Sequence, residues 1–353
     1  MTLYTFRHFW VLFSLFFINK IVISKTQELG ACGTFKTRNR SKRVVGGSDY
    51  TIKQAPWSVQ FNGGTRKNPY DDVCGASIIS GKWCVTVAHC ISGSVSPRYS
   101  RVIAGVSSIN EKTVKFINKW YGNGSGSVKS VDSLHPHPYY DDLRTYNDVG
   151  LIKLKFGLKF NDNVRPICLP KPEMCLKTGS KVTITGWGAT KCKGKKCDDI
   201  AVKLQGAVIP VYSIDKCKKR YSSEKRAGKY YSQVQTCAGD GFSGVDGCDG
   251  DSGSGLFYKD SEGAILWGMN SWSNLPCGKH GYPGVYTRVP KFVDWISKVS
   301  GVYPPGLKKL KRSKSCGDDE TRGLHSDVIV EEVDENSGSG DDPIGTFSDI
   351  FDF

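Results

Sequence analysis

The sequence predicts an all-β domain whose antiparallel strands fold into barrels. Between residues 44 and 301, short β-rich runs alternate with clusters of Gly, Pro, Asn and Asp, which is the pattern of strands separated by turns. The 40 Gly and 15 Pro also argue against a helical bundle or a coiled coil. A stretch of this length suits two barrels that share one cleft. The runs that predict strands are residues 77–79, 83–88, 148–154, 181–185, 207–211, 264–272 and 284–289.

One segment at the end of this region has helical periodicity. Within residues 290–300, Phe292, Val293, Ile296 and Val299 share one face. We therefore predict a single α-helix at the C-terminal end of the domain.

Composition and charge narrow the class of protein. Of the 353 residues, 39% are hydrophobic, which excludes a wholly disordered chain. Thirteen cysteines are too many for a typical cytosolic protein and indicate secretion into an oxidising, extracellular compartment. The net charge is +15, divided as +7 over residues 1–43, +14 over 44–301 and −6 over 302–353. No patterned nucleic-acid-binding motif accompanies this charge, so anionic glycans, membrane surfaces or the acidic tail are better candidate partners than nucleic acid.

The N-terminal end has the features of a secretory signal. In residues 1–24, Arg7 precedes an apolar run at 9–18 that is shorter than the ~20 residues of a membrane span. An uncleaved membrane anchor is the alternative interpretation. No later segment is apolar enough to span a membrane.

Two further segments flank the β-rich region. Residues 25–43 are polar and basic, and they end in Arg43 before the apolar residue Val44, which together form a candidate proteolytic switch point. Residues 302–353 form a basic-then-acidic tail with Ser-Gly repeats, which we expect to be disordered.

Three motifs in chain order carry side chains suited to nucleophilic catalysis. His89 follows a predicted strand, Asp148 begins one, and Ser252 lies in a Gly-Asp-Ser-Gly turn. Each motif alone has a structural explanation: a surface or core His, a capping Asp and a tight turn. A serine hydroxyl is a poor nucleophile at neutral pH, however, and needs a base such as His, which needs an acceptor to hold its tautomer.

In this order, and with further motifs, the chain resembles the trypsin-like (chymotrypsin-fold) serine protease family over residues 44–301. The other shared motifs lie at 165–170, 186–188, 271–272 and 284–286. The resemblance implies two six-stranded antiparallel β-barrels with the active site between them, and a short helix before Cys237. It also implies an endopeptidase that cleaves proteins and peptides, meets macromolecular serine protease inhibitors and needs no cofactor.

The resemblance assigns roles to the three motifs. Ser252 becomes the nucleophile, His89 the general base and then acid, and Asp148 the carboxylate that orients His89. The backbone N–H groups of Gly250 and Ser252 supply the oxyanion hole.

The resemblance also implies a zymogen. Cleavage after Arg43 would free the α-amine of Val44 to pair with Asp251 and order the site, and a buried charge pair needs both partners.

The resemblance also implies where substrate specificity is set, because in the family the residue six positions before the nucleophile lies at the pocket floor, and here that residue is Asp246. A carboxylate in a narrow pocket favours Arg or Lys side chains, and Gly284 matches a wall position where glycine keeps the pocket open. Ser271, Trp272 and Ser273 match the adjoining wall, where the family usually has Gly instead of Ser273. A further departure is Ser254-Gly255, where the family has Gly-Pro after the nucleophile turn.

The resemblance and the cysteine spacing together imply a set of disulfides. Cys84 remains as a buried free thiol, and Val182 and Tyr258 occupy the two places of a common family disulfide that is missing here. The pairs implied in this way are Cys74–Cys90, Cys217–Cys237, Cys248–Cys277 and Cys32–Cys168. Among the cysteines left over, we also expect a local Cys192–Cys197 bridge and a Cys175–Cys316 bond that anchors the start of the tail.

Several surface features remain. Asn123 and Asn39 lie in glycosylation sequons, and we expect no metal site. Basic clusters at 191–196 and 216–229 are either a solvated face or a site for heparin-like glycans. Two alternatives to an active protease stay open: a secreted binding protein on a protease scaffold, and a zymogen whose tail binds a partner or blocks the cleft.

Overall fold

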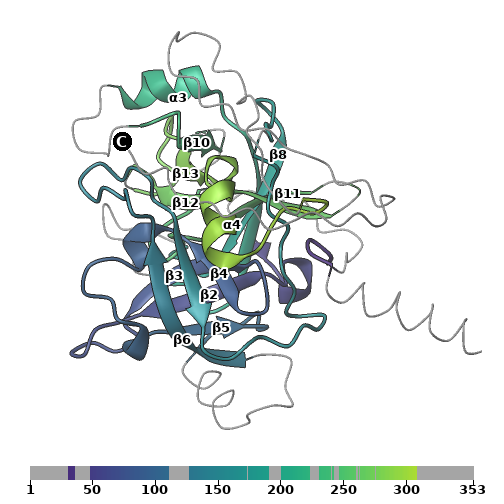
Figure 1. Cartoon of the computed structure of the whole chain (residues 1–353). Helices are drawn as coiled ribbons and strands as arrows, with labels where there is room; N and C mark the ends of the chain where they lie inside the picture. The colour runs from purple at the N-terminus through teal and green to yellow at the C-terminus, as the bar shows by residue number, and fades with distance from the viewer. Residues whose placement is uncertain are drawn as a thin grey trace, which may run out of the picture.

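Figure 1 shows a computed structural model of the 353-residue chain. The predicted signal peptide, the bond after Arg43 and the tail beyond residue 307 lie outside the residues whose structure is described. Those residues are 31–35, 48–110, 127–172, 174–190, 200–222, 230–239, 241, 246–259, 261, 263–274 and 276–307.

The first half of the domain is a closed antiparallel barrel of six strands. Its interior is filled by large apolar side chains such as Phe61, Ile78 and Leu151, each fully buried. In order around the barrel the strands are β2 (Ser58–Gly63), β3 (Asp72–Ile78), β4 (Trp83–Thr86), β7 (Gly150–Leu154), β6 (Ser127–Pro136) and β5 (Arg101–Ala104).

The second half is a seven-stranded antiparallel sheet. An isolated bridge between Val211, directly after β9, and Ala238 of β10 closes six of these strands into a ring. The two-residue strand β1 pairs with β9 outside this ring. Val182 and Tyr258, the places of the missing family disulfide, lie directly opposite one another. The order is β1 (Ser48–Asp49), β9 (Gln205–Pro210), β8 (Lys181–Gly186), β11 (Gly255–Lys259), β12 (Ala264–Trp272), β13 (Gly284–Arg288) and β10 (Gln235–Ala238).

The described residues form two α-helices beside the barrels. α4 (Val293–Ser300) confirms the predicted C-terminal helix, although a short 3-10 turn, η4 (Val289–Lys291), replaces its first residues. α3 (Ile214–Tyr221) begins at Ser213, whose side chain accepts a hydrogen bond from the backbone of Lys216. The helix has eight residues, most of them polar or basic, so its sequence shows no clear apolar stripe. The family resemblance predicts this helix, whereas hydrophobic periodicity alone does not. The remaining 3-10 turns are η1 (Ile52–Gln54), η2 (Ala88–Cys90) and η3 (Pro97–Tyr99).

The two halves pack on one another through a shared core. Trp57, just before β2, meets Phe257 of β11 edge-to-face with ring centroids 5.0 Å apart. At the same seam the buried hydroxyls of Ser58 and Thr185 are hydrogen-bonded at 2.8 Å. In Figure 1 the blue first barrel lies below the green second one, so residues at the seam come from segments far apart in sequence.

The N-terminal segment 31–35 is docked on this body. A disulfide joins Cys32 to Cys168, and Gly33 donates its N–H to the carbonyl of Pro166 at 2.8 Å. The carbonyl of Gly33 in turn accepts from Ala264 at 3.0 Å. The segment is therefore held both by a covalent bond and by the main chain.

An aromatic cluster around Lys259 extends this contact. Its ammonium lies 4.3 Å from the ring centroid of Phe35 and donates a 2.9 Å hydrogen bond to the Tyr50 hydroxyl. Phe35 also packs edge-on against Trp57, with ring centroids 5.9 Å apart. Because Phe35 precedes the predicted activation bond and Tyr50 follows it, one lysine holds chain from both sides of that bond.

Four disulfides are present among the described residues, and all four are expected pairs. Cys84 is buried with a free thiol, as predicted. Cys175 is disulfide-bonded to a cysteine outside the described residues. The four bonds are Cys32–Cys168, Cys74–Cys90, Cys217–Cys237 and Cys248–Cys277. In the described part of the chain, no helix combines the length and the apolar character needed to cross a bilayer.

Candidate active site

Strand pairing in the first barrel brings His89 and Asp148 together. His89 lies in η2 directly after β4, and Asp148 lies just before β7, the strand that pairs with β4. The His89 Nδ1 atom is 2.9 Å from Asp148 Oδ2, and the His89 backbone N–H donates to Asp148 Oδ1 at 3.0 Å. Asp148 is only 2% exposed, so water does not compete for this contact.

The second barrel completes the environment of Asp148. The Ser271 hydroxyl, on β12, donates to Asp148 Oδ2 at 2.6 Å. The Thr287 hydroxyl, on β13, donates to the Asp148 carbonyl at 2.6 Å. Asp148 therefore has hydrogen-bond partners from both barrels.

Two opposing effects act on the His89 imidazole. Burial lowers its pKa, but the charge and hydrogen bond of Asp148, together with the charge of Asp142, raise the pKa above its usual value. The net direction is upward. This environment stabilises the imidazolium form that a general base reaches after it takes a proton.

The Ser252 backbone is anchored beside the Cys74–Cys90 disulfide. The Gly75 N–H donates to the Ser252 carbonyl at 2.7 Å, and the same oxygen lies 3.7 Å from Cys90 Sγ. Since Cys90 follows His89 directly, this contact brings Ser252 to the His89 turn. Among the described residues Ser252 Oγ forms no hydrogen bond, and such catalytic contacts are often long before substrate binds.

A steric constraint explains why glycine follows Ser252. Gly253 has φ +81°, and a Cβ at this position would lie 2.1 Å from the Thr86 hydroxyl oxygen. The turn thus approaches β4 so closely that no side chain fits.

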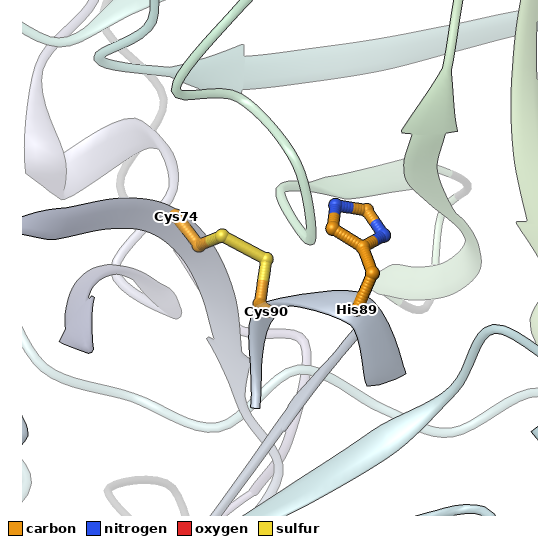
Figure 2. Close-up of side chains that lie close together, drawn as sticks. All are labelled: Cys74, His89 and Cys90. Atoms are coloured by element: carbon orange, nitrogen blue, oxygen red, sulfur yellow. A yellow bond between two sulfur atoms is a disulfide. The ribbon is translucent and has the colours of Figure 1, made fainter. Parts of the chain in front are cut away.

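His89 and two cysteines form a cluster of metal-ligand type in Figure 2. Atoms of Cys74, His89 and Cys90 lie within 4.8 Å of one another. The two sulfur atoms are bonded to each other, so they offer no thiolate to a metal. The cluster is therefore a disulfide next to the His89 imidazole.

The turn before Ser252 presents free backbone donors. Gly250 has φ +91°, a left-handed conformation that suits glycine. Within the described part of the chain, the N–H groups of Gly250 and Ser252 donate to no acceptor. They are therefore available to a developing oxyanion.

Asp251 lies beneath this turn. Its carboxylate accepts hydrogen bonds from the N–H groups of Gly188 at 2.8 Å and Cys248 at 3.1 Å. Burial raises its pKa to about 6. A Cβ on Gly186 would lie 1.9 Å from Asp251 Oδ1, which explains why this motif needs glycine here.

Asp246, six residues before Ser252, is a second buried carboxyl group close to this turn. Its Oδ1 accepts from the Gly247 N–H at 2.8 Å, and burial raises the pKa of its carboxyl to about 8. A Cβ on Gly284 would lie 2.2 Å from the same oxygen. Gly284 is therefore required for a carboxylate at this place, and the Cys248–Cys277 disulfide lies alongside.

The predicted wall residues Trp272 and Ser273 lie at the end of β12, with Trp272 its last residue. Trp272 packs edge-on against Tyr221 of α3, with ring centroids 4.9 Å apart, and Ser273 is half-buried beyond it.

Ser254 is 4% exposed, and a Cβ on Gly75 would lie 2.1 Å from its Oγ. The serine that departs from the family pattern thus fits against a glycine of β3.

Two residues that act on this site were not predicted from the sequence in these roles, and other predicted residues lie outside the described part of the chain. The sequence gives no local signal for Ser271 as a partner of Asp148, since that contact is formed only by the packing of the barrels. Asp142, whose charge acts on His89, was also not among the predicted residues. The predicted residues without a described structure are Arg43, Val44, Asn39, Asn123, Cys192, Cys197 and Cys316.

Comparison with known proteins agrees with this geometry. The profile of the family named Trypsin matches residues 44–296. Phenoloxidase-activating factor 1 of Holotrichia diomphalia is 29% identical over 270 residues, covering 72% of this chain and 69% of that protein. The matched region contains both barrels and the His89, Asp148 and Ser252 motifs. This chain belongs to the trypsin-like serine protease family.

Proposed function

We propose that this chain is a secreted serine endopeptidase, made as a zymogen, that cleaves after Arg or Lys through an acyl-enzyme. The observation that carries the proposal is the His89–Asp148 pair, held at 2.9 Å and supported from both barrels, beside the Ser252 turn. A scaffold that had lost catalysis would have no need for this arrangement. The intact set of three residues therefore favours an enzyme over a binding protein.

The chemistry follows from the arrangement. His89 Nε2 accepts the proton of Ser252 Oγ as that oxygen attacks the substrate carbonyl carbon. The negative charge on the carbonyl oxygen is stabilised by the N–H groups of Gly250 and Ser252, each worth roughly 10²–10³ in rate. His89 then gives its proton to the leaving amine, and a water molecule repeats the sequence to release the acyl group.

Zymogen activation is supported by the position of β1. Ser48, four residues after Val44, pairs with Gly206, which pairs with Thr185 next to Gly186. Two strand spacings amount to ~10 Å, and four residues reach at most ~14 Å. A new N-terminus at Val44 can therefore reach Asp251, which packs against Gly186.

Specificity for Arg and Lys is supported by the Asp246 pocket. A cationic side chain would restore the ionised form of a carboxyl whose pKa is raised to about 8 by burial. Tyr286 and Gly284 lie around the same carboxylate. The half-buried Ser273 narrows the entrance relative to glycine.

Secretion is supported by the four disulfides, which persist in oxidising compartments. Phenoloxidase-activating factor 1 is named as an activator of another protein, and protein substrates suit this chain as well. Macromolecular inhibitors and glycans at Asn123 and Asn39 remain parts of the same proposal.

A heparin-like glycan site is a second element of the proposal. On α3, Lys216, Lys218 and Lys219 are exposed, and among the described residues none pairs with a carboxylate. We expect salt-sensitive retention of the protein on a heparin column. Retention equal to that on a neutral resin at low salt would reject the glycan site and leave the protease assignment intact.

The test of the protease assignment is activation of the purified secreted chain with immobilised trypsin. We expect hydrolysis of Arg and Lys esters that appears only after cleavage at Arg43 and exceeds hydrolysis of a Phe ester. Arg43→Gln should remain inactive after the same treatment, and Ser252→Ala should be cleaved but inactive. Activity of Arg43→Gln equal to wild type would reject the zymogen, and a preference for the Phe ester would reject the specificity.

A further inference from the structure

The last turn of α3 packs against residues on both predicted walls of the specificity pocket. The ring of Tyr221 lies edge-on to Trp272, with centroids 4.9 Å apart, and its hydroxyl donates a hydrogen bond to the carbonyl of Pro283. Pro283 directly precedes Gly284, whose backbone lies against the Asp246 carboxylate. A shift of this end of the helix would therefore be transmitted to the chain beside Asp246.

A pair of cations next to this helix end shares one aromatic ring. The Arg220 guanidinium lies 4.6 Å from the ring centroid of Tyr282, and the Lys279 ammonium lies 4.3 Å from the same centroid. The Arg220 side chain also lies against Gly281, where a Cβ would come within 2.2 Å of its Nη2 atom. Arg220 thus contacts, from α3, the segment that leads to Gly284.

The charge of this pair is not balanced by a carboxylate. Within the residues that the structure describes, neither Arg220 nor Lys279 forms an ion pair. Asp215 lies in the first turn of α3, whereas Arg220 lies in the last. Arg220 is exposed and Lys279 is half-buried, so both remain accessible to an anion. Because the two like charges repel one another, an anion that contacts both is bound favourably.

Further cations continue this charge along the helix. Lys216, Lys219 and Arg220 are exposed, and their i, i+3 and i+4 spacing places them on one side of α3. The Cys217–Cys237 disulfide fixes the helix to β10, and Figure 1 shows α3 at the end of the second barrel, beside β10. A linear polyanion that follows this side of α3 would meet Arg220 and Lys279 at its end. This arrangement suits a chain of closely spaced sulfate groups.

We propose that Arg220 and Lys279 form an effector site for the sulfate groups of a heparin-like glycan, and that glycan bound there lowers KM for substrates cleaved after Arg or Lys. The proposal rests on the proposed Arg/Lys endopeptidase and its glycan site, and it adds a regulatory link between the two.

The direction of the effect follows from the contacts. A sulfate group held by both cations offsets their repulsion and fixes the Tyr282 segment in place. Ordering this segment before substrate arrives reduces the free-energy cost of binding a side chain at Asp246. The value of kcat should change little, because the His89–Asp148 pair is oriented by hydrogen bonds of its own.

The experiment measures hydrolysis of a small Arg ester by the activated enzyme, with and without a saturating heparin oligosaccharide. We expect KM to fall roughly two- to fivefold, the range of an exposed ion pair. The fall should be absent in the Arg220→Gln/Lys279→Gln double variant. Lys216→Gln is the matched control, because Lys216 lies on the same side of α3, one turn before Arg220. It should elute from heparin at lower salt than wild type and keep the fall in KM at saturating glycan.

The possible outcomes separate this inference from the proposals on which it rests. An unchanged KM for a wild-type enzyme that heparin retains would overturn the regulatory link and leave the glycan site standing. A fall in KM that persists in the double variant would also overturn it. A fall with polyglutamate but not with the heparin oligosaccharide would assign the site to acidic polypeptides and reject the glycan as effector. No retention on heparin would reject the glycan site together with this inference, and no hydrolysis of any basic ester would reject the proposed protease.

Discussion

Asp148 Oδ2 accepts two hydrogen bonds, from His89 Nδ1 at 2.9 Å and from the Ser271 hydroxyl at 2.6 Å. The first partner belongs to the same barrel as Asp148, and the second belongs to β12 of the other barrel. The orientation of the Asp148 carboxylate therefore depends on how the two barrels pack. Through this bond Ser271 acts on the site by holding Asp148, and in this role it is a positioning residue.

Replacing Ser271 by alanine should lower kcat roughly tenfold with little change in KM, because a hydrogen bond to a buried carboxylate is lost. The acid limb of the pH–rate profile should also move, since Asp148 loses a donor that stabilises its charge. Steady-state kinetics across pH measure both effects. Ser77→Ala is the control, because the Ser77 hydroxyl is buried and has no partner among the described residues. An unchanged profile for Ser271→Ala would show that this bond does not position the site.

The pH dependence of kcat/KM should follow His89. The base must be neutral to accept the serine proton, and Asp148 and Asp142 raise its pKa above 6.5 against the opposing effect of burial. Activity should therefore rise with pH through a midpoint above 6.5. In Asp142→Asn the midpoint should move to lower pH, because one negative charge beside the imidazole is gone. A midpoint below 6.5 in the wild-type enzyme would contradict this electrostatic description.

Asp246→Asn should lower the activity on Arg esters and, at alkaline pH, raise the stability of the folded protein. Hydrolysis of Arg esters should fall by roughly 10²–10³, the effect of removing one partner of a buried charge pair. The folded-state pKa of about 8 lies above the unfolded value of 3.8, so the folded protein binds more protons between these values and its stability declines as pH rises. The asparagine variant escapes this decline. Its Tm should exceed that of wild type at pH 8 and match it at pH 4, as measured by calorimetry.

Phe35 provides a test of the docked N-terminal segment. Phe35→Ala removes an edge-on contact with Trp57 and a cation–π contact with Lys259, together worth about 1–2 kcal/mol. We expect denaturant unfolding to show this loss while kcat/KM of the activated enzyme stays unchanged. Phe156→Ala is the matched control, because Phe156 is 65% exposed. Equal stability losses in the two variants would mean that the segment contributes nothing specific.

The sequence predicts those parts of the structure that depend on local patterns and on family motifs. Strand and turn alternation indicates the barrels, and the resemblance indicates pairs such as Cys32–Cys168. The Ser271–Asp148 bond, the cluster around Lys259 and the position of Asp142 are different in kind. Each depends on side chains that are brought together by tertiary packing. No local sequence pattern predicts such contacts, so they become visible only in the folded structure. Helix α3 is intermediate, because its eight residues are too few and too basic for a clear apolar stripe.

The measurement that tests the central claim most directly is covalent labelling of the activated protein with an organophosphate, followed by mass spectrometry. Immobilised trypsin is used for activation and removed first. The account predicts a single phosphoryl adduct on Ser252 of the cleaved chain, none on Ser252→Ala, and none on the uncleaved Arg43→Gln protein. A folded chain with a free Val44 N-terminus that remains unlabelled at Ser252 would contradict it.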